Sequence, residues 1–222
     1  MSPGSERVAR SAQAPGYEVR RKMLRHNKAI LIGFLLAIVF FVAGCAPSAP
    51  LTISLALKVP TVPLNIGGGT KVYPSVLDQT DKILGYRARD AWRQYQGPIS
   101  VSEDVGTVML KSLKDGLSSL GFETLVSAEP SAPTLEVTAQ GLRYEIMTGT
   151  TIAVANFSAT ITVKIHKDTT LLYAMRYDNS HERTYNHLRA SDRSWFEENF
   201  NAVLADLIGQ LLTDLELLKA LR

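Results

Sequence analysis

The most reactive side chain in this sequence belongs to Cys45, its only cysteine. It follows fifteen apolar residues, Ala29 to Ala43, and then Gly44. A charged segment, Arg20 to Lys28, precedes the apolar stretch. A charged segment, an apolar stretch and small residues at its end form the pattern of a secretory signal with its cleavage site. The pattern predicts export of the chain and cleavage next to a thiol.

The segment Val42-Ala43-Gly44-Cys45 resembles the lipobox of bacterial lipoprotein precursors. The resemblance implies that Cys45 receives a diacylglycerol and, after cleavage, begins the mature protein, with fatty chains such as palmitate as its anchor. Residues 1–44 would be the signal peptide, and Met23 is a second candidate start of translation. An Asp after the modified cysteine favours the inner membrane. Because Ala46 stands there, we expect the periplasmic face of the outer membrane.

A transmembrane helix is the alternative interpretation of the same stretch. A spanning helix needs about 20 apolar residues. Here the apolar stretch has fifteen, and Pro47 and Pro50 follow where a helix would have to continue. We therefore favour the lipid anchor.

The basic residues are concentrated before Cys45. Of the 24 Lys/Arg and 21 Asp/Glu residues, seven and two lie in residues 1–44, which leaves 17 basic and 19 acidic residues and a net charge of −2 afterwards. A nearly balanced surface offers no general attraction for phosphate backbones. Nucleic acid is therefore not an expected partner.

The mature chain has the length of one domain. Residues 45–50 form a short Pro-rich spacer after the lipidated cysteine, and residues 51–222 are long enough for a single core. With Cys45 carrying lipid, no second thiol is present for a disulfide or a thiolate metal cluster. The fold must be stabilised by packing alone.

Four residues could suggest a metal site: His166, His181, Glu182 and His187. His181 and His187 are six residues apart, which does not match the i, i+4 spacing of two histidines on a zinc-binding helix. The segment 179–189 is polar. We interpret its histidines as solvated loop residues and expect no metal.

Other catalytic patterns are equally weak. The sequence has no Gly-x-Ser-x-Gly and no Ser-x-x-Lys motif, and its segment 67–71 lacks the Gly-Lys-Ser/Thr order of a phosphate loop, so it predicts a turn. Asp78, Asp81 and Asp90 could converge for acid-base work, but no spacing indicates that they do. We expect neither cofactor nor enzymatic activity.

Aromatic and arginine side chains are crowded between Gly85 and Gly97. Such residues often anchor protein interfaces. The candidate interaction residues are Tyr86, Arg87, Arg89, Trp92, Arg93 and Tyr95. Alternatively, Trp92 covers the edge of the sheet as part of the core, and the arginines keep a loop soluble.

Apolar periodicity predicts the elements that position these residues. The expected strands are residues 51–59, 72–78, 122–126, 135–146, 159–165 and 171–177, with a bulge at Gly141 and a turn at Lys167-Asp168. One helix spans 105–120, capped by Ser100 and Glu103 and ended by Gly121. A second long helix is capped by Ser194 and Glu197. Residues 82–98 read as a loop or irregular element.

Two helices with one apolar face each need a sheet to cover. We therefore predict an α+β fold, a two-layer sandwich whose largely antiparallel sheet carries two helices on one face. The other face of the sheet, the wet sheet face, would be exposed to solvent. It is a second candidate surface for binding a protein partner. It would carry Glu136, Thr138, Thr160, Thr162 and Lys164.

The order of these features resembles the YajG family of lipoproteins from residue 45 to about 220. The better matches are Leu120-Gly121-Phe122 and Leu135-Glu136-Val137, and a helix near Asn201-Ala202-Val203-Leu204 agrees. The resemblance implies an envelope lipoprotein without catalytic residues. We expect an interaction or assembly module with an envelope protein partner. The alternatives are an accessory lipoprotein for envelope glycolipid handling or transport, favoured by an apolar cleft between helices and sheet, and an envelope hydrolase.

Overall fold

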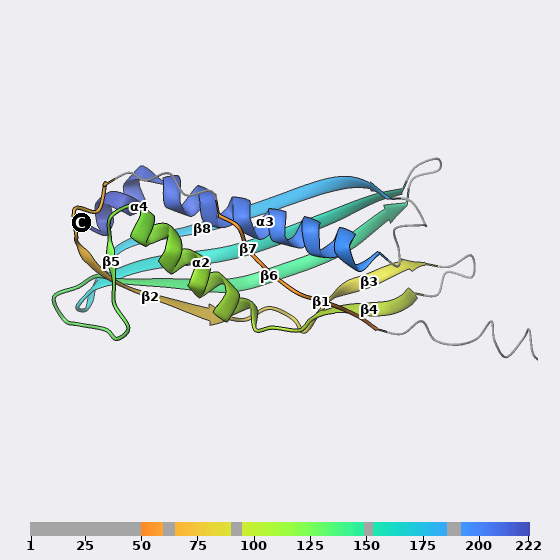
Figure 1. Cartoon of the computed structure of the whole chain (residues 1–222), viewed down its shortest axis with the longest axis horizontal. Helices are drawn as coiled ribbons and strands as arrows, with labels where there is room; N and C mark the ends of the chain where they lie inside the picture. The colour runs from red at the N-terminus through yellow and green to blue at the C-terminus, as the bar shows by residue number, and fades with distance from the viewer. Residues whose placement is uncertain (1–49, 60–64, 90–94, 149–152, 186–191) are drawn as a thin grey trace, which may run out of the picture. The chain divides into compact units, whose positions relative to one another are not determined.

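Eight strands and three helices form the described part of the chain, residues 50–59, 65–89, 95–148, 153–185 and 192–222 of a computed structural model (Figure 1). All of them belong to the unit Ser48–Arg222. In chain order they are β1 (Leu51–Ile53), β2 (Lys71–Asp78), β3 (Ile83–Arg89), β4 (Tyr95–Val101), α2 (Val105–Ser119), β5 (Glu123–Thr124), β6 (Thr134–Thr148), β7 (Ala153–Lys167), β8 (Thr170–Tyr185), α3 (Arg193–Thr213) and α4 (Leu215–Ala220).

The larger sheet has five strands in the order β5-β2-β6-β7-β8. Strands β6, β7 and β8 form the predicted antiparallel meander, whereas β2 is parallel to both β5 and β6. Helices α2 and α3 lie on the same face of this sheet (Figure 1). The predicted two-layer α+β sandwich is confirmed, with a sheet that is mixed at its β2 side.

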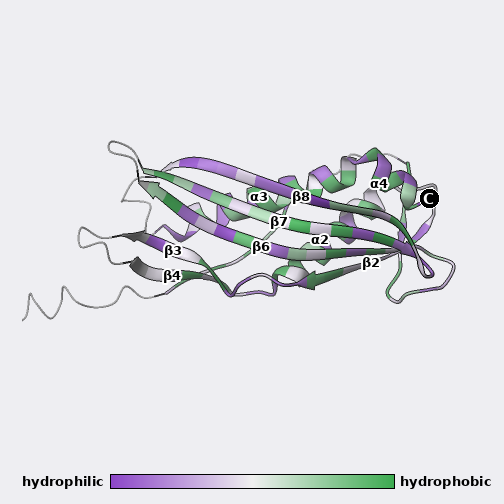
Figure 2. Cartoon of the chain, turned by 180° about the vertical axis from the view of Figure 1, so that it is seen from behind, coloured by the Kyte–Doolittle hydropathy of each residue, from purple (hydrophilic) through white to green (hydrophobic). Residues whose placement is uncertain are grey.

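The meander follows the predicted alternation. Residues of β7 are alternately buried and partly exposed, and Figure 2 shows the matching alternation of hydrophobic and hydrophilic residues along β6 and β7. The pairing of β6 with β7 shifts between Ala139 and Gly141, which confirms the predicted bulge. A two-residue turn at Asp168 and Thr169, with Asp168 at φ 53°, connects β7 to β8.

The cores of both helices are as predicted, but their caps are different. Asp104 is the N-cap of α2 and accepts a hydrogen bond from the Thr107 N–H at 2.6 Å, so the predicted Ser100–Glu103 capping box is wrong. Asp192 caps α3 instead of Ser194. The predicted stop at Gly121 is confirmed, since this glycine has φ 84° directly after the helix.

Residues 54–59 are extended, but they are not the strand that alternation predicts. Strand β1 ends at Ile53. The Ser54 N–H donates to Glu197 at 2.8 Å, the Leu55 N–H to Glu103 at 3.2 Å and the Ala56 N–H to Asn201 at 2.8 Å. Side chains from α3, and Glu103 just before α2, therefore accept the hydrogen bonds that a neighbouring strand would otherwise accept. Because Glu103 and Glu197 bind this segment, they do not serve as capping-box residues.

Residues 82–98 include two strands, so their interpretation as a loop or irregular element is wrong. Strands β3 and β4 pair antiparallel, and β4 pairs parallel with β1 in a second sheet of order β1-β4-β3. The β3–β4 pairing shifts register three times, which removes the period of two from the sequence. A Cβ at Gly85 would collide with the backbone carbonyl of Tyr144, so this strand contacts β6 closely.

The core between helices and sheet is aromatic toward one end. Phe157 of β7 has its ring centroid 5.1 Å from Tyr144, 5.2 Å from Trp195 and 5.0 Å from Phe200. Further along, the void lined by Met109, Leu113 and other aliphatic side chains measures only about 10 Å³. Among the described residues, none of the helices is both long and apolar enough to cross a bilayer.

Asp214 ends α3 and begins α4. One of its carboxylate oxygens accepts hydrogen bonds from the hydroxyls of Tyr173 at 2.8 Å and Tyr177 at 2.6 Å, and the other from the N–H groups of Glu216 and Leu217. Burial raises the pKa of Asp214, but these hydrogen bonds outweigh it and hold the pKa below its ordinary value of 3.8. The ionised carboxylate thus fixes the end of the helix layer to β8.

Two glycines lie inside helices in different surroundings. A Cβ on Gly116 of α2 would collide with the side chain of Leu212 on α3, so this glycine permits the close approach of the two helices. A Cβ on Gly209 of α3 would meet no atom within 4 Å. Glycine inside a helix costs about 1 kcal/mol relative to alanine, and packing among the described residues does not account for Gly209.

We expect Asp214→Asn to lower the free energy of unfolding by about 2 kcal/mol at pH 6, because charge-assisted hydrogen bonds to both tyrosines are weakened. A lowered folded pKa contributes stability above the unfolded value of 3.8, and this contribution is lost as the pH falls through the folded value. The difference between the two proteins should therefore shrink below pH 4. Urea unfolding at several pH values measures it, with Asp115→Asn on the exposed side of α2 as control. A difference that does not change with pH would contradict this account.

The two helical glycines should respond oppositely to alanine. We expect Gly209→Ala to stabilise the protein by about 0.5–1 kcal/mol, because the helix gains propensity and the methyl group meets open space. Gly116→Ala should destabilise it by about 1 kcal/mol, because Leu212 must move within a packed contact. Thermal and urea unfolding of the two variants check the sign, and equal effects would show that the difference in space is irrelevant.

Candidate functional site

The predicted lipidation site lies outside the described residues. Cys45 and the lipobox residues Val42, Ala43 and Gly44 all precede residue 50, so lipidation remains a prediction. The structure does describe how the chain continues from there. Leu51 begins β1, which pairs with Ile99 to Val101 of β4, close to the point where α2 starts at Val105.

Four of the predicted interaction residues lie in β3 and β4. Tyr86 is 45% exposed, whereas Arg87 is only 8% exposed. Arg89 and Tyr95 are backbone partners at the last described pair of the two strands. Trp92 and Arg93 lie outside the described residues. Their role in an interface, and the alternative of Trp92 as a core residue, therefore stay predictions.

His181 lies in a strand and not in a solvated loop. It belongs to β8, which extends to Tyr185, and its side chain is 17% exposed with Nε2 2.9 Å from a carboxylate oxygen of Asp206 on α3. His166 pairs with Leu171, ten residues from His181 along β8, and His187 lies outside the described residues. Within the described ranges, no group of three or more His, Cys, Asp or Glu side chains could hold a metal ion.

The carboxylates considered for acid-base chemistry act as acceptors for the backbone. Asp78 accepts hydrogen bonds from Thr80 and, at 3.1 Å, from the Val105 N–H at the start of α2. Glu103 lines the same surface groove as Asp78 and Asp81, and hydrogen bonds from Ser54 and other donors lower its pKa. Asp90 lies outside the described residues. The geometry of this groove explains local folding and shows no convergence on a reacting atom.

A groove of about 580 Å³ opens between the C-terminal ends of α2 and α3. Its floor is mainly apolar, Ser119, Gln210 and Thr213 add polar groups, and Asp206 adds a carboxylate. Leu215, the first residue of α4, is 66% exposed here. The apolar and glycine positions are Ile66, Ala205, Gly116, Leu120, Gly209, Leu212, Leu215 and Leu218.

This groove was not predicted from the sequence. Its walls come from helices that are about 90 residues apart in the sequence, so no short sequence pattern could predict the groove. One residue in the sequence could have pointed to the groove. Gly209 lies inside a helical pattern, and a glycine there usually has a packing or functional reason. In the structure Gly209 lines the groove, and without a side chain at this position the backbone of α3 faces the groove directly.

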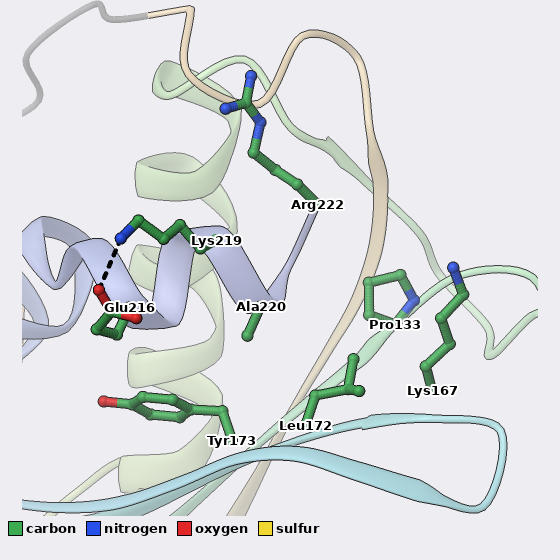
Figure 3. A pocket seen from close by; sticks show the side chains of 8 residues that line it. All are labelled: Pro133, Lys167, Leu172, Tyr173, Glu216, Lys219, Ala220 and Arg222. Carbon is green, nitrogen blue, oxygen red and sulfur yellow. Dashed lines mark hydrogen bonds and ion pairs between the residues drawn. The ribbon is translucent and has the colours of Figure 1, made fainter.

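A second hollow of about 450 Å³ lies on the other side of α4 (Figure 3). Lys167 approaches it from the β7–β8 turn, and Lys219 and Arg222 approach from the end of the chain. Glu216 forms an ion pair with Lys219 at 2.7 Å. Three cationic side chains and one carboxylate give this surface the chemistry of a weak, exposed anion site.

Comparison with known proteins gives a family. A model of a family described as "Uncharacterized lipoprotein" matches residues 88–222, more than half of the chain. No curated protein sequence matches the chain.

The solved structures that the chain is similar to are distant in sequence. One from Xanthomonas campestris, of the family DUF330, is 11% identical with a TM-score of 0.48, over 72% of this chain and 94% of that one. A minor lipoprotein from Acinetobacter baumannii is 13% identical with a TM-score of 0.43, over 66% and 92%. Rare lipoprotein B from Shewanella oneidensis is 11% identical with a TM-score of 0.39, over 63% and 90%. On the match of residues 88–222, the chain belongs to this family of uncharacterized lipoproteins of the YajG type.

Proposed function

We propose that this protein is a lipid-anchored lipoprotein of the outer membrane, held at its periplasmic face by Cys45, and that it acts as a non-enzymatic interaction module of the cell envelope. Membership of a lipoprotein family supports the anchor and the envelope. The lipobox at Val42 to Cys45 supplies the residue, and Ala46 favours the outer membrane. Two or three fatty chains hold a protein at a bilayer firmly, whereas a single chain binds only marginally.

The observation that carries the interaction role is the groove between α2 and α3. An apolar floor with polar groups around it is the anatomy of a protein-binding site. Gly209 costs the helix stability and leaves the groove open, since a Cβ there meets nothing. We assign this groove to an apolar side chain from an envelope protein, which can approach the α3 backbone at Gly209. The stretch Tyr86 to Tyr95 and the wet sheet face are the alternative surfaces.

Glycolipid handling is the alternative function. It would be favoured by an apolar cleft between the helices and the sheet. There the structure has a void of about 10 Å³, about what a single water molecule needs and far too small for an acyl chain. The surface groove has the volume for a short apolar chain, but the cationic hollow lies across α4 from it. A protein side chain fits these observations better.

Changing Cys45 to Ser removes the thiol to which we expect the diacylglycerol to be attached. We expect the variant to carry no lipid-labelled product and to lose the processed, membrane-anchored form. Metabolic labelling with palmitate, fractionation and mass spectrometry of the purified protein measure this. A processed wild-type protein with an unmodified Cys45, or unchanged palmitate labelling of the variant, would contradict the anchor.

A photo-crosslinking residue in place of Leu215 should capture an envelope protein in intact cells, because this side chain is exposed at the groove. The same residue at Tyr86 or Lys164 tests the two alternative surfaces. We expect Gly209→Met to fill the groove and reduce crosslinking from position 215 about tenfold, because losing an apolar contact of about 1.4 kcal/mol lowers the affinity tenfold. Crosslinking from position 86 should be unchanged.

Two outcomes would speak against the groove. One is an adduct from position 86 or 164 with none from position 215. The other is a crosslink from position 215 that Gly209→Met leaves unchanged. The stability of Gly209→Met, measured by thermal unfolding, separates a filled groove from a misfolded protein.

A further inference from the structure

Strand β8 is an unusually long edge of the sheet. It has 16 residues, Thr170–Tyr185, and it is the last strand in the order β5-β2-β6-β7-β8. Edge strands are normally protected by shortness, proline, bulges or charged side chains, especially lysine; of these, β8 has charged side chains of both signs. Strand β8 contains no proline, glycine or lysine, and its one irregularity lies at its beginning, between the pairs Ile165–Tyr173 and His166–Leu171. From Tyr173 onward, the outer edge presents regular backbone groups with no partner strand among the described residues.

Helix α3 holds this strand in place from one face. The residues of β8 opposite buried β7 positions point toward the helices: Tyr177 hydrogen bonds to Asp214 at 2.6 Å, the Asn179 amide to the Val203 carbonyl at 3.2 Å, and His181 lies 2.9 Å from Asp206. These contacts cover the face of β8, and no described strand pairs with its outer edge. The edge is therefore preorganised for pairing with another strand.

The other face of β8 carries charges in a self-complementary order. Arg176, Asp178, Ser180 and Glu182 alternate along it, opposite Thr162, Thr160, Ser158 and Asn156 of β7. Figure 2 shows hydrophilic residues along most of this edge strand. Arg176 binds Asp178 at 2.9 Å, whereas the Glu182 carboxylate has no ion pair within the described residues.

We propose that β8 pairs antiparallel with β8 of a second copy of this chain, about a two-fold axis at Asn179. In this register Arg176 lies opposite Glu182 of the second copy, and the contact occurs twice because the interface is isologous. The paired segment runs from residue 173 to residue 185, which leaves the irregularity at Leu172 just outside it. The two five-stranded sheets become one continuous sheet with both helix layers on the same side.

The neighbouring registers are less favourable. An axis at Asp178 places this carboxylate against its own copy, and an axis at Ser180 places Asp178 opposite Glu182; like charges directly opposite one another destabilise a strand pair. An axis at Tyr177 would also bring opposite charges together, Arg176 against Asp178, but it would draw the irregularity at Leu172 into the paired segment. In the register at Asn179, Arg176 lies between Asp178 of its own chain and Glu182 of the second copy. The order of charges and the position of the irregularity together favour a second copy as the partner and the axis at Asn179.

Charge reversal tests the proposal on the full chain purified in detergent. We expect the wild-type protein to sediment as a dimer. Each single variant, Arg176→Glu or Glu182→Arg, should raise the dissociation constant at least about tenfold, because two like-charged pairs replace two ion pairs. The double variant Arg176→Glu with Glu182→Arg restores opposite charges and should recover dimerisation to within about threefold of the wild type. A monomeric wild-type protein, or a double variant as weak as the singles, would overturn the proposal.

A disulfide test checks the register independently. In a Cys45→Ser background, Asn179→Cys places the two thiols opposite each other at the axis, within the reach of a disulfide. Glu182→Cys is the matched control, because its two copies would be six residues apart along the strands, about 20 Å. We expect an oxidised dimer from position 179 and none from position 182. The reverse result, or no dimer from position 179, would overturn the proposed axis. Neither test depends on the lipid anchor or on the groove at Gly209.

Discussion

The burial of one face of the β6–β7–β8 meander under α2 and α3 is the constraint on which the rest of the structure depends. Phe157 illustrates it, since its fully buried ring contacts side chains from β6 and α3 at centroid distances near 5 Å. The void in the aliphatic part of this layer measures only about 10 Å³. Because this part of the interior has little free space, the candidate recognition features are at the surface, namely the groove between the helices, the ends of the sheet and the outer edge of β8.

Elements stabilised by contacts between residues close in the sequence could be predicted, whereas features that depend on distant residues could not. Alternation along β6 and β7 and the helical spacing around Leu113 and Leu204 report burial against a neighbouring layer, so these elements and the two-layer fold were predictable. The caps were not. Ser100 and Glu103 match a capping box locally, but Glu103 instead binds Ser54 and Leu55, which are almost 50 residues away. A short motif cannot show that a distant segment competes for the same carboxylate.

The missed elements have equally specific causes. The β3–β4 pair escaped prediction because three register shifts within it remove the period of two. The extended segment after Ile53 has the burial pattern of a strand, but its donors are satisfied by side chains instead of a strand. The groove depends on how closely Gly116 lets α2 approach Leu212, a distance that no local pattern contains. The sequence sign of the groove was Gly209, because a glycine inside a helix lowers helix stability and no local pattern explains why it is there.

The same architecture separates the proposed activities in space. Leu51 enters beside β4, where α2 begins, while the groove lies where α2 and α3 end, and β8 occupies the edge of the sheet away from β2. The start of the described chain and the groove therefore lie at opposite ends of the helix layer. The paired segment proposed for β8 shares no side chain with the groove floor. Asp206 is the residue that links the two regions, because it lines the groove and binds His181 on β8. This contact joins the lining of the groove to the helix-facing side of β8, so a change of side chain at position 206 would alter both surfaces.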